Sequence, residues 1–348
     1  MDNKVYLIGS DAFYYVALAD SFVDTGQLRD ITSIPSKIPR FPQNGIVFVH
    51  VFLSLLGFSN HGHFIYIVFL NYFLYLSCIY PLYKIARKVG MECGLGLTLL
   101  LSVYLGAWHI YRINLLVLND GIFNSLILWL VYYIIELVKL LDNNDKNFLS
   151  LKILKKIIVI NLLLMLSVQF RVTAGLIIGS AILGTISIRN FKATIWILIG
   201  CILLLGSFFL VYSFIEVRRL EGMGLTQIND LMRSTFNIIR IKSILWKILP
   251  RLLIGSSGLT NPLLTLFYTI FPLSMFYFMF KGFSQRNFTK IFISIICLSG
   301  LWFTLNYNNA RFIWYTFPFI YLIILSLKRA RFIGYVFVLI VFLQSLQQ

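Results

Sequence analysis

Residues 121–141 read GIFNSLILWLVYYIIELVKLL, and Glu136 and Lys139 are the only charged side chains in that run. At a rise of 1.5 Å per residue, an α-helix of about 20 apolar residues crosses a hydrocarbon core of about 30 Å. This run therefore predicts a helix that spans a membrane, and the fold class depends on how often such runs recur along the chain.

Similar runs recur along the whole chain. Of its 348 residues, 59% are hydrophobic and 12% are charged, and the mean hydropathy is +0.85. Soluble domains are about 45–50% apolar and about 25% charged, so the composition excludes a soluble nucleotide-binding enzyme or nucleic-acid-binding domain. We expect an all-α polytopic membrane protein with about ten transmembrane helices. The expected spans are Phe64–Tyr83, Gly94–Ile110, Gly121–Leu141, Ile157–Phe170, Val172–Ile188, Thr194–Val217, Leu263–Phe280, Ile291–Asn306, Phe312–Leu327 and Phe332–Leu346.

Basic residues are not spread evenly over the connecting segments. Alternate short connections carry clusters of Lys and Arg, which the positive-inside rule places in the cytoplasm, and this accounts for much of the net charge of +17 without nucleic acid as a partner. The clusters are Lys84, Arg87 and Lys88; Lys146, Lys152, Lys155 and Lys156; Arg189 and Lys192; Lys281, Arg286 and Lys290; and Lys328, Arg329 and Arg331.

The same alternation divides the chain into four parts. We expect an outer amino-terminal segment over residues 1–63, a six-helix membrane module over 64–217, a basic outer loop over 218–262 and a four-helix membrane module over 263–348. The apolar run Gly45–Phe58 is interpreted as an interfacial or re-entrant helix, because counting it as a span would move every later basic cluster outside. The loops long enough to build a site are then extracytoplasmic.

Asp11 is the first candidate catalytic residue. Ser10 or Asp11 can cap the amino end of a short helix that stops at Gly26. At 100° per residue Asp11 shares no face with Asp20 or Asp24, which favours a separate role. Asp11 is either a helix cap or a carboxylate beside the membrane that acts as a general base or binds a divalent cation.

A second acid, Asp120, lies at the outer end of the third expected span. Ionisable groups so close to hydrocarbon are functional hypotheses by default, and Arg112 is its expected partner. A structural Arg112–Asp120 ion pair or a helix cap is the alternative. A metal shared by His61 and His63 is disfavoured, because residues two apart on a helix point away from each other.

Several cations are expected on the outer side. Arg218 and Arg219 open a loop that carries many basic residues, Arg171 stands between two spans, and Arg311 precedes a span that contains Pro318. Guanidinium groups are well suited to binding phosphate. Anionic lipid headgroups or outer-leaflet saccharide explain the charges of that loop equally well, and the alternative for Arg311 is an interfacial anchor.

The order of these motifs resembles the GT-C class of integral-membrane glycosyltransferases. In that class the first outer loop opens with an acid in a pattern similar to Asp11, Tyr15, Ala19 and Gly26, and interfacial helices and a late Arg and Pro follow. The later elements that resemble the class are Arg40–Gly45, Leu55–Phe58, Arg311, Phe312 and Pro318. The first span of the class and the large outer domain that some members carry after the last span have no counterpart here.

The resemblance implies a sugar donor linked to polyprenyl phosphate or diphosphate and an acceptor glycan or lipid, on the extracytoplasmic side of the inner (plasma) membrane. Asp11 would be the general base or a ligand of a divalent cation, and Asp120 a second acid. The arginines implied to offset charge on the leaving phosphate are Arg112, Arg171, Arg218, Arg219 and Arg311. The alternatives are a polysaccharide or O-antigen polymerase, which can open with a motif similar to Gly9-Ser10-Asp11 and Tyr14, and a flippase or transporter of a lipid-linked saccharide, which would not need Asp11.

Overall fold

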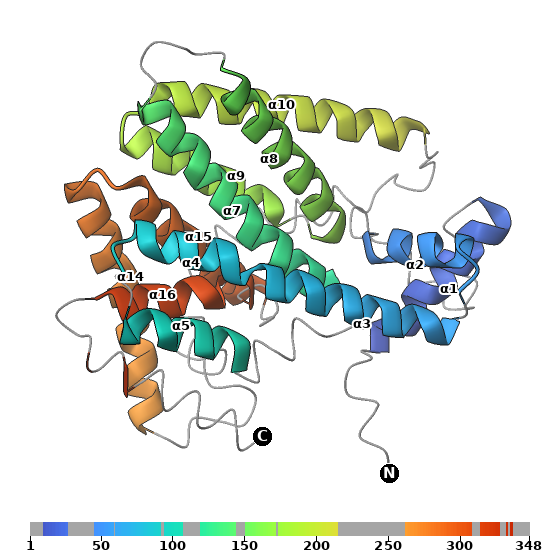
Figure 1. Ribbon diagram of the computed structural model, residues 1–348, viewed down its shortest axis with the longest axis horizontal. Coiled ribbons are helices and arrows are strands. Elements are labelled where there is room, and N and C mark those ends of the chain that lie inside the picture. The colour runs from blue at the N-terminus through green and yellow to red at the C-terminus, as the bar shows by residue number, and fades with distance from the viewer. Residues whose placement is uncertain are drawn as a thin grey trace.

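The computed structural model describes residues 10–26, 45–58, 60–91, 94–106, 119–143, 150–171, 173–214, 262–307, 314–327, 332 and 335–336. The regular structure within these ranges is helical and contains no strand, which confirms the expected all-α class (Figure 1). The elements are α1 (Ser10–Thr25), α2 (Gly45–Leu55), α3 (Asn60–Ser77), α4 (Ile79–Lys88), α5 (Leu95–Gly106), α7 (Asn119–Asn143), α8 (Leu151–Phe170), α9 (Ala174–Ser187), α10 (Phe191–Phe214), α14 (Pro262–Ser284), α15 (Phe288–Tyr307), the 3-10 helix η4 (Trp314–Thr316) and α16 (Phe317–Ser326).

Helix is present in each of the first nine expected spans, and most of the tenth lies outside the described residues. Two helical stretches, Gly62–Lys88 and Asp120–Asp142, are long and apolar enough to cross a membrane by themselves. Six other apolar helices in the described ranges are 10–17 residues long: Gly45–Leu55, Leu95–Gly106, Ala174–Ser187, Phe191–Leu203, Phe288–Gly300 and Phe317–Ser326. The total of ten spans therefore stays a prediction.

The outward faces of several helices are strongly apolar. Phe69 and Phe73 on α3 are 65% and 71% exposed, and Ile202 on α10 and Phe280 on α14 are similarly open. Soluble monomers rarely expose contiguous apolar surface of this extent. The surface of the helices therefore supports the interpretation, made from composition, that lipid surrounds them.

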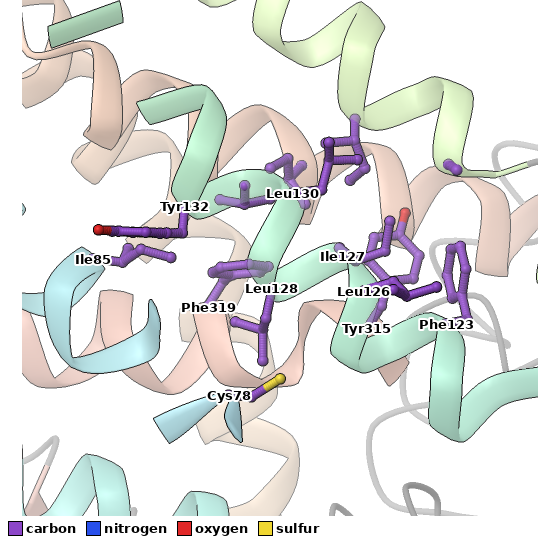
Figure 2. Close-up of a cluster of buried hydrophobic side chains, with 14 of the residues drawn as sticks. Cys78, Ile85, Phe123, Leu126, Ile127, Leu128, Leu130, Tyr132, Tyr315 and Phe319 are labelled. Carbon is purple, nitrogen blue, oxygen red and sulfur yellow. The ribbon is translucent and has the colours of Figure 1, made fainter. Parts of the chain in front are cut away.

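Helix α7 forms the centre of the bundle. Of its most apolar stretch, 83% is buried, and it contacts α3, α4, α8 and α9. Figure 2 shows Leu126, Leu128 and Leu130 of α7 among side chains from other elements, including Cys78, Ile85 and Phe319. A helix that is apolar on nearly all sides is stable only where protein or lipid covers every face, and α7 is covered mainly by protein.

Two ion pairs fix the register of α7 against α8. Asp120 pairs with Arg171 at one end of the two helices, and Glu136 pairs with Lys156 over 3.6 Å toward the other end. Sixteen residues separate the two acids and fifteen separate the two bases, which correspond to about 24 Å and about 23 Å of helix. The spacings match, so a slip of one helical turn would break both pairs.

The amino-terminal helices α1 and α2 pack together beside the start of α3 (Figure 1). Helix α1 ends as expected at Gly26, whose φ of +68° is the left-handed conformation that favours glycine. Helix α2 has eleven residues and is about 16 Å long, and its interfacial or re-entrant position stays a prediction. At Gly45 an added Cβ would lie 2.9 Å from the ring of Phe170, so α2 starts in close contact with the end of α8.

Candidate functional site

The candidate site is a buried ion pair between Asp120 and Arg171. The guanidinium Nη2 of Arg171 contacts carboxylate Oδ1 of Asp120, and the two side chains are 12% and 3% exposed. The residues are 51 positions apart in the sequence, so the pairing depends on how α7 and α8 pack. The sequence indicated both residues as site candidates but did not pair them.

The local backbone explains why both charges are tolerated there. Asp120 lies in the first turn of α7, where the positive end of the helix dipole favours a carboxylate. Arg171 follows the last residue of α8, where the negative end of a dipole favours a cation, and its amide donates a hydrogen bond of 2.9 Å to the carbonyl of Ser167. Each charge is therefore stabilised by its helix as well as by its partner.

Two aromatic side chains, Tyr315 and Phe123, lie near the pair. Tyr315 of η4 packs edge-to-face on Phe123, one turn after Asp120 on α7, with ring centroids 5.7 Å apart (Figure 2). Tyr315 is 2% exposed and interacts electrostatically with Arg171. Because Phe170 also contacts Gly45, four segments meet at this point: the start of α7, the end of α8, η4 and the start of α2.

This arrangement is chemically suited to anion binding. A guanidinium carries five N–H donors in a planar fork that matches the oxygens of carboxylate and phosphate groups. A buried ion pair adds little net stability compared with an apolar pair of similar volume, because both charges lose hydration. Charged groups buried at such a cost are candidates for a function, with a structural clamp between helices as the alternative.

Most of the other site candidates from the sequence lie outside the described residues: these are Arg112, Arg218, Arg219 and Arg311. Asp11 is in the first turn of α1, and its side chain is not among those described. Arg112 was the expected partner of Asp120, and Arg171 is the partner that the described residues provide. Within the described part of the chain, no three or more His, Cys, Asp or Glu side chains gather as metal ligands, so a divalent cation at Asp11 stays a prediction.

Sequence reasoning missed a second polar cluster, formed by His50 of α2 and His63 of α3. Both side chains are fully buried, their Nδ1 atoms are 3.4 Å apart, and Nε2 of His63 is 3.0 Å from the carbonyl oxygen of Phe58. Burial, helped by repulsion from His63, lowers the pKa of His50 from 6.5 to about 4. The sequence feature that indicates this cluster is the lone His50 in the apolar run of α2, because a buried histidine requires a polar partner.

Comparison with known proteins finds a distant structural likeness. No family model and no curated protein matches the chain. A distant match among solved structures is the archaeal oligosaccharyltransferase AglB from Archaeoglobus fulgidus, in complex with an inhibitory peptide and a dolichol-phosphate. Identity is 12% and the TM-score is 0.47, over 97% of this chain and 51% of that one. The chain spans about half the length of that protein, and a likeness at this level carries no argument about function.

Proposed function

We propose that this protein is a membrane glycosyltransferase that moves a sugar from a polyprenyl phosphate or diphosphate donor to an extracytoplasmic glycan or lipid acceptor in cell-surface glycan assembly. The observation that carries the proposal is the buried Asp120–Arg171 pair, at the junction of α7 and α8 with the amino-terminal segment that contains Asp11. It is supported by the apolar composition and by the order of the motifs in the sequence.

In the proposed reaction, Asp11 takes the proton from an acceptor hydroxyl as that oxygen attacks the anomeric carbon of the donor sugar. The bond from the anomeric carbon to the phosphate oxygen breaks, and the lipid-linked phosphate leaves with the electron pair. Attack from the face opposite the leaving group inverts the anomeric configuration. A carboxylate beside the membrane is suited to this role, because partial desolvation raises its basicity.

Charge develops on the leaving phosphate, and Arg171 is the described residue that would offset it. Donors fixed before the reaction stabilise such charge best, because they need no reorganisation in the transition state. In the described structure Asp120 holds the guanidinium in place. Arg112, Arg218, Arg219 and Arg311 are proposed to supply further positive charge on the same extracytoplasmic side of the inner membrane.

The direct test is transfer of radiolabelled sugar from a polyprenyl-linked donor to extracted glycan, in membranes that carry matched amounts of wild type, Asp11→Asn or Asp24→Asn. Asp24 lies on the same helix and is exposed at its other end, so it is the matched control. We expect transfer to fall by at least about 100-fold in Asp11→Asn, since general bases contribute about 10²–10⁴, and to be retained in Asp24→Asn.

The products also separate the alternatives. Addition of single sugars supports the proposed transferase, whereas long polymeric products would indicate a polysaccharide polymerase that uses the same donor. Equal transfer by wild type and Asp11→Asn would reduce Asp11 to a helix cap and leave transport of lipid-linked saccharide as the better explanation.

A further inference from the structure

The buried contact between His50 and His63 is not used by the proposed transfer reaction. His50 lies near the middle of α2 and His63 in the first turn of α3, so the contact joins two helices. The ring of Phe64 packs edge-to-face against the ring of His50, with the two ring centroids 6.0 Å apart. Two imidazoles in an otherwise apolar contact need a compensating interaction.

The hydrogen bonds available to this pair do not satisfy it. The carbonyl of Phe58 can only accept, so Nε2 of His63 carries a proton and Nδ1 of neutral His63 is a bare lone pair. If His50 is protonated at Nδ1, its N–H faces that lone pair over 3.4 Å, beyond the usual range of about 2.7–3.2 Å, and its own Nε2 is buried without a partner. If His50 is protonated at Nε2 instead, two lone pairs face each other.

A transition-metal ion fits the arrangement in which the Nδ1 atoms of His50 and His63 both present a lone pair. Zinc binds imidazole nitrogen at about 2.0–2.1 Å with tetrahedral geometry, which places two nitrogen ligands about 3.3–3.4 Å apart. The observed Nδ1–Nδ1 separation of 3.4 Å matches that value. Histidines that bind metals also usually donate their second N–H to a carbonyl or carboxylate, as His63 does to Phe58.

We propose that the Nδ1 atoms of His50 and His63 bind one divalent transition-metal ion of the zinc class, which fastens α2 to the start of α3. Metal binding uses the neutral form of imidazole, whose ring nitrogen offers a lone pair. No third His, Cys, Asp or Glu ligand accompanies them in the described part of the chain, so water or another oxygen ligand completes the coordination. The site is separate from the proposed cation at Asp11 and does not rest on the transferase function.

The test uses full-length protein purified in detergent through a tag without histidines, stripped of metal with a chelator and titrated with Co²⁺. Wild type is expected to bind one ion per chain and to develop the visible absorption of tetrahedral Co²⁺, which Zn²⁺ then removes. In His50→Gln and His63→Gln we expect the affinity to fall at least about tenfold, since loss of a mere orienting partner already costs about 10–100-fold.

His61→Gln is the matched control, because it removes a histidine two residues before His63 from the same helix, and positions two apart do not face each other. It should bind Co²⁺ like wild type. Absence of a tetrahedral spectrum in the wild type overturns the proposal without any variant. Unchanged affinity in folded His50→Gln and His63→Gln, with folding checked by size exclusion and circular dichroism, overturns it as well.

Discussion

Breaking the Asp120–Arg171 pair from either side is expected to destabilise the protein strongly. The two side chains are 3% and 12% exposed, so water compensates little for the loss of a partner. Removal of one member of a buried pair leaves an uncompensated charge and typically costs about 3–5 kcal/mol. We therefore expect Asp120→Asn and Arg171→Gln each to lower the free energy of unfolding by that amount.

The double variant distinguishes this explanation from ordinary loss of packing. With both charges gone, no unpaired charge stays buried. The free energy of unfolding of the double variant should therefore lie within about 2 kcal/mol of wild type, a loss well below the sum of the two single losses. Unfolding by sodium dodecyl sulfate in mixed micelles, followed by helical circular dichroism, measures all four proteins under one condition. Strictly additive losses, or single losses below about 1 kcal/mol as in exposed pairs, would refute the reasoning.

Three further predictions concern packing and charge, and the same unfolding titration tests them. An added Cβ at Gly184 of α9 lies 2.9 Å from a ring of α15, so Gly184→Ala should cost about 1–3 kcal/mol, whereas Gly179→Ala on the same helix meets nothing within 4 Å and should be neutral or stabilising. A Gly184 variant as stable as wild type would show that α15 is not tightly packed there. Glu136→Gln leaves its two lysine partners unneutralised in partly exposed surroundings and should cost about 1–3 kcal/mol; a loss that persists unchanged in high salt would argue against an electrostatic cause. Gly45→Ala should cost about 1–3 kcal/mol through its contact with Phe170, and Phe170→Leu should recover part of it; no recovery would place the damage elsewhere.

The positions of the helices followed from hydropathy, while their ends were harder to predict. Helix α8 begins at Leu151, capped by the hydroxyl of Ser150, and not at Ile157 as expected for the span. Hydropathy locates only the apolar part of a helix. Helix α8 continues beyond that part through Lys152, Lys155 and Lys156, because long basic side chains can reach polar surroundings from a helix end. The stop at Gly26 was predictable because glycine alone readily adopts the left-handed conformation that ends α1.

The candidate site was only half predictable. Alternation of basic loops placed both Asp120 and Arg171 on one side, but a sequence does not state which of several outer arginines an acid will meet. That choice depends on how α7 and α8 pack. Arg171 is the partner within the described residues, and the expected partner Arg112 lies outside them. The histidine cluster was missed for a similar reason, since His63 meets a residue of the preceding helix and was considered only together with His61.

The matched ion pairs of α7 and α8 also bear on how the protein enters the bilayer. A lone Asp or Arg carried into lipid is costly during insertion, by about 2.5–3.5 kcal/mol on translocon-derived scales. Asp120 and Glu136 of α7 pair with Arg171 and Lys156, which belong to α8 and its carboxyl-terminal cap and follow α7 in the chain. The two helices can therefore leave the translocon together as a hairpin whose paired charges cancel, and neither helix would partition as well alone.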